Sequence, residues 1–475
     1  MFGLDTSMLS SGMTILFFFC IVMVFAFEFI NGFHDTANAV ATVIYTKTLQ
    51  PVTAVVWSGL MNFCGVLFSA TLGYTVAMKI ANLLPAEALL QSGGNSGQAA
   101  AMAIAVLLAA IIWNLGTWYL GIPCSSSHTL IGALLGVGIV FSYLPENVNK
   151  VTVNMDEAKK IGLSLLVSPL FGFSVAIVLM FVLRSFMKTK EAKQIFKEPE
   201  ADARPPLWIR VILFCTCTLV SFFHGSNDGQ KGLGLLLVIL MAFMPLQHAL
   251  SPEFSQQKAM ASLETIQNAL PLKDTAAAYA PKELTQAGVT IGLLKNDIMT
   301  ANLSEVKTAF NIRKRISVLG KSVKVLLDEP NVIQNVAAQK SIKKELETLK
   351  NYTTHVPFWG LIMISLALGI GTMIGWKRIV VTIGEKIGKR HMTYAEGATA
   401  ELVAAVTIGL SSNFGWPVST THVLSSGVAG AMVASKGTKN LQRSTITNIA
   451  LAWLLTLPVT IILSGGLYLL FRMFL

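Results

Sequence analysis

A six-residue pattern occurs twice in the chain, each time within a long apolar stretch. Residues 123–128 read PCSSSH and residues 417–422 read PVSTTH, and a glycine stands two residues before each proline, at Gly121 and Gly415. A second pattern is also doubled, GFHD at 32–35 and GSND at 225–228, and each copy lies upstream of one copy of the first. The repeats predict that the chain consists of two halves of like design.

The composition limits the class of protein. Of 475 residues, 53% are hydrophobic and only 13% are charged, and the mean hydropathy is +0.62. This is more apolar surface than a soluble core can bury, so we expect a polytopic membrane protein. The net charge is +11, but the basic residues gather in short loops between apolar segments. That pattern indicates loops on the cytoplasmic side, not nucleic-acid binding.

The apolar stretches predict an order of segments. Residues 14–46 would form a helix of roughly 50 Å across a hydrocarbon core of about 30 Å, so we expect a break at Gly32. A similar interruption is expected at residues 224–231. Residues 99–141 and 397–434 each form two apolar legs, either a re-entrant hairpin or two crossings. The predicted boundaries are a first repeat at 1–186, a cytoplasmic basic linker at 187–210, the first broken span of the second repeat at 211–245, a helical extracytoplasmic insert at 246–355 and the remainder at 356–475.

Orientation follows from the number of crossings and from loop charge. Each half is expected to cross an odd number of times, so the halves face opposite ways. Lysines and arginines in 184–210, 377–390 and 436–443 place those loops in the cytoplasm, whereas the loop at 81–98 has neither residue. Both termini and the insert are then extracytoplasmic. The predicted fold class is an all-α polytopic membrane protein with two inverted-topology repeats, broken helices, two-legged hairpins and a helical extramembrane insert.

Two aspartates at matching places, Asp35 and Asp228, fall within apolar sequence, where a charge is costly. Broken helices of inverted repeats form the binding sites of many secondary transporters, and helix N-termini there face anionic groups. We expect each proline to suit the first turn of a helix that offers hydroxyls and unpaired backbone N–H groups. Two such helix ends facing each other could surround a tetrahedral oxyanion. The predicted substrate-binding residues are Asp35, Asn38, Ser125, Ser126, Ser127, Asn227, Asp228, Lys231, Ser419, Thr420 and Thr421.

Four histidines fall in these motifs, and each is either a hydrogen-bonded core residue or a proton relay. No pair of these histidines has helical ligand spacing, which disfavours metal ligation by this set. Lys231 can offset the charge of an anion or pair with Asp228, and Glu28 has no assigned role beyond lining the first broken helix. The predicted coupling or relay residues are His34, Asp35, His128, His224, Asp228, Glu401 and His422.

The doubled motifs resemble the signatures of the inorganic phosphate transporter (Pit) family, and of its bacterial low-affinity members in particular. The resemblance runs through essentially all of the membrane portion. It implies inorganic phosphate as substrate, proton symport, phosphate carried as a neutral complex with a divalent metal, no resident cofactor and an inner-membrane location. Departures are His34 in place of an Asn, Lys231 where the first copy has Asn38, and Asn62 in place of a Glu of sodium-coupled relatives. The last departure favours protons over sodium.

Three alternatives stay open from the residues. The first is a sodium-coupled carrier of phosphate or of another tetrahedral oxyanion such as sulfate. The second is an intramembrane Ser/His hydrolase, disfavoured because neighbours such as Ser127 and His128 point about 100° apart on a helix. The third is a passive channel. The expected partners are inorganic phosphate, protons, divalent metal ions, the lipid bilayer and, as an open option, a second copy in a homo-oligomer; nucleic acid is not expected.

Overall fold

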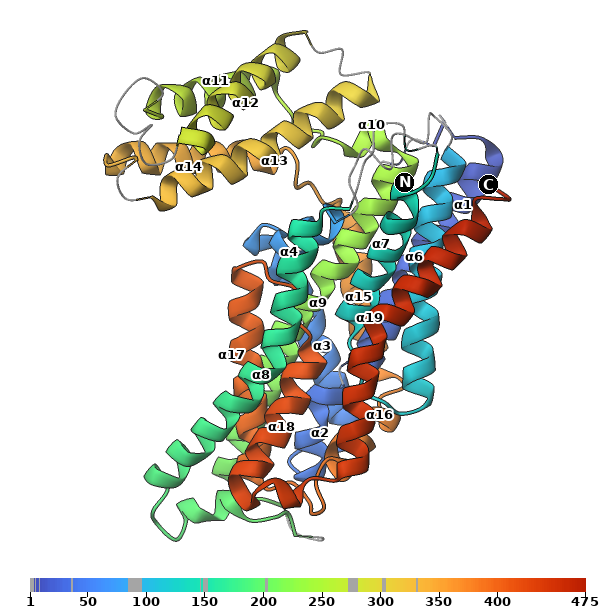
Figure 1. Ribbon diagram of the computed structural model, residues 1–475. Helices are drawn as coiled ribbons and strands as arrows, with labels where there is room; N and C mark the ends of the chain where they lie inside the picture. Colours follow the sequence, from blue (N-terminus) through green and yellow to red (C-terminus); the bar gives the residue numbers. More distant parts are fainter. Residues whose placement is uncertain are drawn as a thin grey trace. The chain divides into compact units, whose positions relative to one another are not determined.

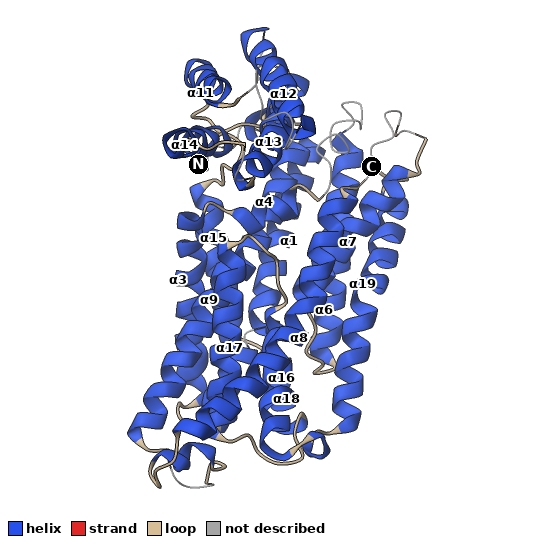
Figure 2. Ribbon diagram, turned by 60° about the vertical axis from the view of Figure 1, so that its left-hand side comes forward, coloured by secondary structure: helices blue, strands red, loops and turns tan. Residues whose placement is uncertain are grey.

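The computed structural model describes the chain except for residues 1–3, 5, 8, 36, 84–95, 146, 148–152, 201–203, 272–280, 301–304 and 330–331, and the side chains of residues 37, 38, 72, 96, 157, 281, 306 and 307 are likewise not described. The described residues form helices and no strand, with one isolated bridge between Gly388 and Leu441 (Figure 2). The chain divides into two compact units, Met1–Ile239 with Pro357–Leu475 (unit 1) and Leu240–Val356 (unit 2).

Unit 1 contains the apolar helices of both halves (Figure 1). The helices of the first half are α1 (Ser11–Asp35), α2 (Ala37–Tyr45), α3 (Pro51–Ser69), α4 (Thr75–Ala81), α6 (Ser96–Tyr119), α7 (Ser126–Ser142) and α8 (Met155–Phe186). Those of the second half are α9 (Leu207–Phe243, of which the last four residues belong to unit 2), α15 (Phe358–Met373), α16 (Lys377–Val381), α17 (Tyr394–Asn413), α18 (Thr420–Lys436) and α19 (Arg443–Phe471).

Six helices of the described part are long and apolar enough to cross a membrane, and the bent pair Phe358–Met373 and Lys377–Lys386 would make a seventh span. Large apolar side chains cover their outer faces, among them Val178, Phe181, Leu454 and Ile462, each more than half exposed. Such a surface suits hydrocarbon and not water. The predicted all-helical membrane protein is confirmed at this level.

The predicted helix breaks are only partly correct. Helix α1 continues through Gly32 and ends at Asp35, and α9 is one helix of 37 residues that continues through the expected interruption at 224–231. The glycines serve close helix packing. A Cβ added at Gly32 would lie 2.4 Å from the backbone oxygen of Leu368 on α15, and one at Gly225 would lie 2.2 Å from the backbone oxygen of Asn62 on α3. Small residues allow this approach between membrane helices.

The two-legged segments reverse direction at turns of the same construction. Gly121 and Gly415 have φ of +66° and +64°, in the left-handed region that favours glycine. At the first turn the N–H groups of Gly121 and Ile122 donate to the carbonyls of Trp118 and Thr117, at 2.9 Å each. The second turn has the same pair of bonds from Gly415 and the next residue. This is the Schellman arrangement that ends a helix, and it explains why the glycine is doubled with the motif.

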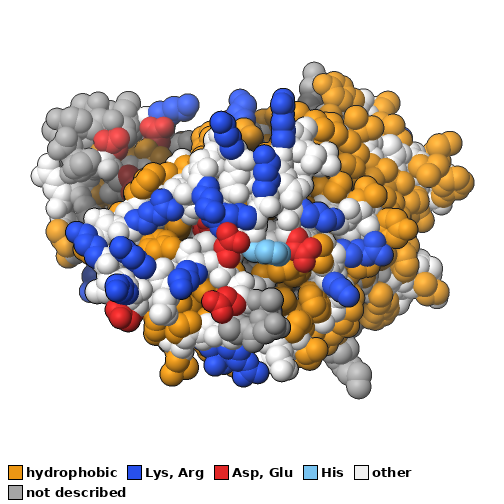
Figure 3. All heavy atoms as spheres, turned by 90° about the horizontal axis from the view of Figure 1, so that it is seen from below, with side chains coloured by type: hydrophobic (Ala, Val, Ile, Leu, Met, Phe, Trp, Pro, Cys, Tyr) orange, Lys and Arg blue, Asp and Glu red, His pale blue; other side chains and the backbone are white. Residues whose placement is uncertain are grey.

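Basic residues gather at one end of unit 1, opposite the end where α1 begins and α19 ends. Figure 3 shows this face, with many lysine and arginine side chains. Exposed members from the helix ends and loops of this region are Lys188, Lys190, Lys193, Lys377, Arg378, Lys386, Lys389, Lys436, Lys439 and Arg443.

Unit 2 is a small helical domain. Its helices are α10 (Pro245–His248), α11 (Gln256–Ala269), α12 (Pro281–Thr300), α13 (Val306–Asp328) and α14 (Val336–Asn351). Helix α11 packs on α14 and α12 packs on α13, with buried Leu263, Ile291, Ile316 and Leu346 in a common core. The apolar residues recur at helical spacing, so each helix buries one face.

Candidate functional site

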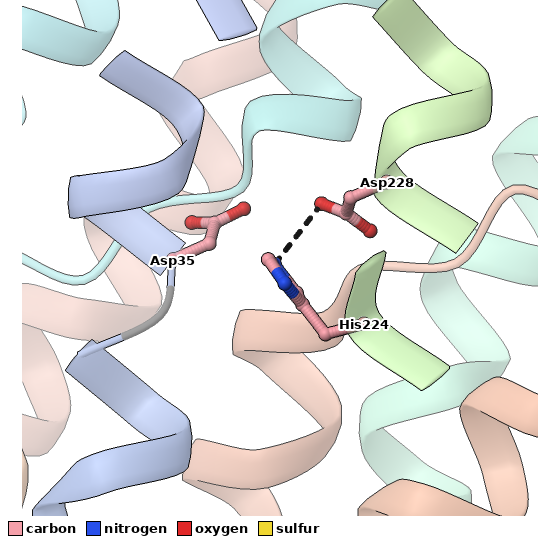
Figure 4. Close-up of side chains that lie close together, drawn as sticks. All are labelled: Asp35, His224 and Asp228. Atoms are coloured by element: carbon pink, nitrogen blue, oxygen red, sulfur yellow. Dashed lines mark ion pairs between the residues drawn. The ribbon is translucent and has the colours of Figure 1, made fainter. Parts of the chain in front are cut away.

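The two aspartates of the doubled motifs meet inside unit 1. Asp35, at the end of α1, lies near Asp228 and His224 in the middle of α9 (Figure 4). One ligand atom from each of the three residues lies within 4.8 Å of the others, and all three side chains are buried. His224 Nε2 lies 3.5 Å from Asp228 Oδ2, one turn apart on the same helix. The four histidines lack helical ligand spacing among themselves, but His224 has it with a carboxylate.

Lys231 neutralises part of this charge. Its Nζ donates to Asp228 Oδ1 at 2.6 Å, from three residues further along α9, and to the carbonyl oxygen of Val418 at 3.3 Å. Of the two roles that the sequence left open for Lys231, the pairing with Asp228 is therefore present. The side chain is 1% exposed, so its charge acts at close range in the protein interior.

The two hairpin turns meet at the same place. Ser127 Oγ, from the first turn, donates to the carbonyl oxygen of Val418 in the second at 2.9 Å. Thr421 Oγ1, from the second turn, donates to Asp35 Oδ1 at 2.8 Å. The N-termini of α7 and α18, although separated by almost 300 residues of sequence, therefore lie together beside the aspartates.

The first hydroxyl residue of each triplet caps its helix. Ser125 Oγ accepts from the backbone N–H of His128 at 3.2 Å, and Ser419 Oγ accepts from that of His422 at 3.1 Å. The caps precede the helices, so Pro123 and Pro417 lie before the caps and not in the first turns as expected. Serine caps bond N–H groups of the third helical residue and leave those of the first two available.

The second hydroxyl residue of each triplet has no assigned contact. Ser126 Oγ and Thr420 Oγ1 are buried and have no hydrogen-bond partner among the residues described, and the same is true of Asn227 Oδ1, His224 Nε2 and Asp228 Oδ2. A buried polar atom without a partner is costly. Because these atoms belong to facing segments, the region is suited to a polar ligand that would satisfy them.

The predicted relay residues lie in three places: beside the aspartates, at a pair of neighbouring histidines, and at Glu401. His34 Nδ1 lies 3.0 Å from Asp35 Oδ1, and its Nε2 lies 3.1 Å from Thr117 Oγ1. His128 and His422 lie side by side with ring centroids 4.6 Å apart, and His422 stacks on Trp453 at 3.9 Å.

Glu401 lies apart from both groups. Its carboxylate is fully buried and accepts from the hydroxyls of Thr42 and Thr216, the latter at 2.5 Å. It is thus not brought into direct contact with the aspartates. The side chain of Asn38 lies outside the described residues.

Two residues to which the sequence assigned no role at the site lie beside it. Asn62, on α3, accepts from His224 Nδ1 at 2.8 Å, and its own amide donates to Thr372 Oγ1 at 3.0 Å. Glu28, on α1, is fully buried and packs against Gly232, next to Lys231. The available signal was a polar residue inside an apolar span, which marks functional positions in membrane helices.

The bond to Asn62 determines what His224 can do. Since the Asn62 oxygen can only accept, His224 Nδ1 carries the proton, and Nε2 of the neutral ring is left with a lone pair directed toward Asp228. With two carboxylates beside it, this nitrogen forms a group that can hold either a proton or a divalent cation. No serine of the described motifs bonds a histidine ring, so the nucleophile–base pair of a hydrolase is not formed.

The apolar helices surround a buried site in which two hydroxyl-bearing helix ends lie beside carboxylates. These features together are those of a membrane transport protein. Residues 31–464 match the model of the phosphate transporter family. The chain is 40% identical to the low-affinity inorganic phosphate transporter PitB of Escherichia coli K12 over 96% of each chain, and 40% identical to PitA of the same strain over 98% of this chain and 97% of that one.

The chain belongs to the phosphate transporter family, as its motifs indicated, and it is a transporter and not an enzyme. A probable low-affinity inorganic phosphate transporter of Bacillus subtilis is 28% identical over 97% of this chain. A solved structure titled the sodium-dependent phosphate transporter has the same fold, with a TM-score of 0.54, 20% identity and coverage of 97% of this chain and 100% of that one.

Proposed function

We propose that the protein imports inorganic phosphate across the cytoplasmic membrane by proton symport, with phosphate carried as a neutral complex with a divalent metal. The substrate is supported by the E. coli relatives, which are inorganic phosphate transporters by name. The observation that carries the proposal is the pair of facing helix N-termini with unpartnered hydroxyls at Ser126 and Thr420.

Phosphate would bind between α7 and α18. Each helix has 17 residues, and its N-terminus carries the positive end of the helix dipole and two uncapped N–H groups. Ser126 and Thr420 would donate to phosphate oxygens. Thr421 now donates to Asp35, and Ser127 donates to the carbonyl of Val418. On binding, these two hydroxyls would donate to the substrate instead, so the bonds that hold these segments together would be released.

The cation of the complex would bind at Asp35, His224 and Asp228. Two carboxylates and one neutral imidazole are a ligand set for divalent metals, and the phosphate oxygens would complete the coordination. Lys231, which is paired with Asp228, would offset part of the negative charge of the two carboxylates. Together these groups would hold a tetrahedral anion in a region where an isolated ion is costly.

An inverted repeat is supported by which helices pack together. Helix α7 packs on α19 and α18 packs on α8; α6 packs on α19 and α17 packs on α8. Likewise α1 packs on α15, and α9 bonds α3 through Thr218 and Ser221. When α1, α3, α6, α7 and α8 are exchanged with α9, α15, α17, α18 and α19, the two contacts named in each of these three couples interchange. We therefore infer that the two hairpins enter from opposite faces and that alternating access is a rocking of one half against the other.

Proton coupling would use the buried histidines and Glu401. His34 and His224 contact the aspartates directly, so protonation there changes the charge at the substrate. Glu401 accepts only from neutral hydroxyls among the described residues and would carry its proton separately. The basic face of Figure 3 would be cytoplasmic by the positive-inside rule, with both termini extracytoplasmic and the insert on their side.

Uptake of labelled phosphate into proteoliposomes tests the proposal. We expect saturable uptake driven by an inward proton gradient, dependence on a divalent metal, and no response to an imposed sodium gradient at fixed pH. Loss of one hydrogen bond to the charged substrate in Thr420→Val should lower uptake at low phosphate by about tenfold. Thr71→Val, at an exposed threonine whose hydroxyl donates to the carbonyl of Phe68 at the end of α3, is the control. Sodium-driven uptake without proton dependence would refute the coupling, and normal uptake by Asp35→Asn would remove Asp35 from the mechanism.

A further inference from the structure

A second site of different character lies at the basic end of unit 1. A cavity of about 660 Å³ opens beside the break between α15 and α16. Its wall includes the end of α6 and the start of α16, with the aromatic residues Trp118, Tyr119 and Trp376 and the cations Lys377, Arg378 and Lys386. None of these side chains belongs to the proposed phosphate site.

Arg378 is held in place by its neighbours. Its guanidinium carbon lies 5.1 Å from the ring centre of Trp118 and 4.9 Å from that of Tyr119. Its Nη1 also donates to the backbone oxygen of Tyr119 at 2.7 Å. The two ring contacts and the hydrogen bond to Tyr119 fix the plane of the guanidinium. Its other N–H groups stay available to a ligand, and their fork geometry matches phosphate oxygens.

The positive charge of this pocket is not balanced. In the described part of the chain, Lys377, Arg378 and Lys386 form no ion pair with a carboxylate. The neighbouring carboxylate, Glu385, accepts from the hydroxyl of Tyr45 and does not line the cavity. Three exposed cations therefore face an opening that holds no acidic group of its own.

The rest of the pocket is apolar and borders the outer face of the helices. Leu120 and Tyr119 are 69% and 65% exposed, and α6 continues outward with exposed Ile112. A free ion would satisfy the cations but not this surface. An amphiphile satisfies both, because its charged head can lie at the cations while its chains follow the helices.

We propose that this pocket binds one anionic phospholipid of the leaflet at the basic end of the protein. The phosphodiester would lie against Arg378, Lys377 and Lys386, and an acyl chain would follow Leu120 along α6. The basis is charge complementarity together with continuity from the cavity to the lipid-facing surface. Basic pockets between membrane helices, at their cytoplasmic ends, are suited to phospholipid head groups.

The experiment uses the purified full chain in mixed micelles of phosphatidylcholine and phosphatidylglycerol, with retained lipid counted by native mass spectrometry. The test variant combines Lys377→Gln, Arg378→Gln and Lys386→Gln. The matched control, Lys188→Gln with Lys190→Gln and Lys193→Gln, removes the same charge from exposed positions outside the pocket. Both variants change exposed side chains, and their thermal unfolding midpoints verify that they are folded.

The proposal predicts that the test variant loses affinity for phosphatidylglycerol by at least about tenfold, while the control stays near the unchanged protein. Arg378→Lys alone should lose part of the affinity, because it keeps the charge and loses the fork. Equal losses in the two triple variants would overturn the proposal. So would displacement of the lipid by millimolar inorganic phosphate, since the pocket would then be a site for the free anion. Neither readout depends on phosphate uptake.

Discussion

Each of the three hydroxyl residues in a doubled motif has its own role. Ser125 and Ser419 cap their helices, Ser126 and Thr420 have no partner among the described residues, and the third member makes a contact across the site. The sequence indicated the triplets as a set because both lie deep in apolar sequence. It could not separate the roles, because the cap depends on where each helix begins, and that residue was placed too early by assuming a first-turn proline.

The surroundings of the carboxylates were likewise only partly predictable from the sequence. Asp35 and Asp228 were predictable because charge within apolar sequence needs a purpose. The sequence left open whether Lys231 pairs with Asp228, and the pairing depends on α9 continuing as one helix through the interruption expected at 224–231. The bond from His224 Nδ1 to the Asn62 oxygen, which determines the nitrogen that faces the aspartates, joins residues 162 positions apart in sequence. No local pattern predicts such a contact, so the sequence indicated His224 as a relay residue but not the orientation of its ring.

The Asp228–Lys231 pair gives a prediction for stability. Lys231→Met leaves Asp228 buried without its cation, and we expect a loss of about 3–5 kcal/mol in unfolding free energy. The double variant with Asp228→Asn removes both charges and should lose clearly less. Thermal unfolding of the purified protein measures the difference.

The control is an exposed ion pair. Lys436 lies 3.9 Å from Glu198 and is 62% exposed, so Lys436→Met should change stability by less than about 1 kcal/mol. If the double variant were as unstable as Lys231→Met alone, the lysine would act through packing and not through charge.

At the scale of elements, a glycine in a membrane helix can mark a break in the helix or allow another helix to approach closely. The sequence read Gly32 and Gly225 as breaks, because the apolar stretches are too long for one straight crossing. The structure uses both for close contact with another helix, and α9 accommodates its length without interruption. Whether a glycine marks a break or a close helix contact depends on the backbone of the neighbouring helix, and the sequence around the glycine does not show where that backbone lies.

Two glycine substitutions test this interpretation. In Gly225→Ala the new Cβ meets the backbone of Asn62 at 2.2 Å, so α3 and α9 must move apart, and we expect a loss of about 1–3 kcal/mol together with impaired uptake. Gly466→Ala, on the exposed face of α19, meets nothing within 4 Å and should stabilise its helix by about 0.5–1 kcal/mol. Comparable destabilisation by both would show that backbone flexibility, and not packing, is needed at Gly225.

Helix α10 of unit 2 gives a pH prediction. Burial lowers the pKa of His248 to about 4, and the nearby charge of His355 adds to this effect. Because the folded state holds this histidine neutral, the unfolded chain binds the proton more readily between pH 6.5 and 4. The stability of unit 2 should therefore be fully present above about pH 6.5 and fall by roughly 2–3 kcal/mol toward pH 4.

Hydrogen exchange of unit 2 peptides in the full chain measures that effect. Exchange protection should weaken from pH 7 to pH 4.5, after correction for the intrinsic exchange rate, and His248→Gln should remove most of the dependence. Unchanged protection in the native chain, or the same loss in the variant, would assign the pH effect to other groups.

For the whole molecule, the apolar stretches and the doubled motifs were sufficient to predict a polytopic helical membrane protein of this family, and both are confirmed. The separate polar segment appears as a compact unit at Leu240–Val356. Composition determines these features, because hydrocarbon permits few backbone structures. The doubled motifs also indicated that the two hydroxyl-bearing helix ends would face each other, and Ser127 of one segment bonds Val418 of the other. The position of Glu401 away from them depends on packing between distant helices and required the structure.

The central claim is that the N-termini of α7 and α18 enclose an oxyanion between them. Arsenate, a heavier analogue of phosphate, allows a direct test, because its position in crystals of the protein can be found by anomalous scattering. The account predicts one arsenic peak within about 4 Å of both Ser126 Oγ and Thr420 Oγ1, a distance set by the arsenic–oxygen bond and one hydrogen bond. A peak bound elsewhere, with these two hydroxyls still unoccupied at saturating arsenate, would contradict it.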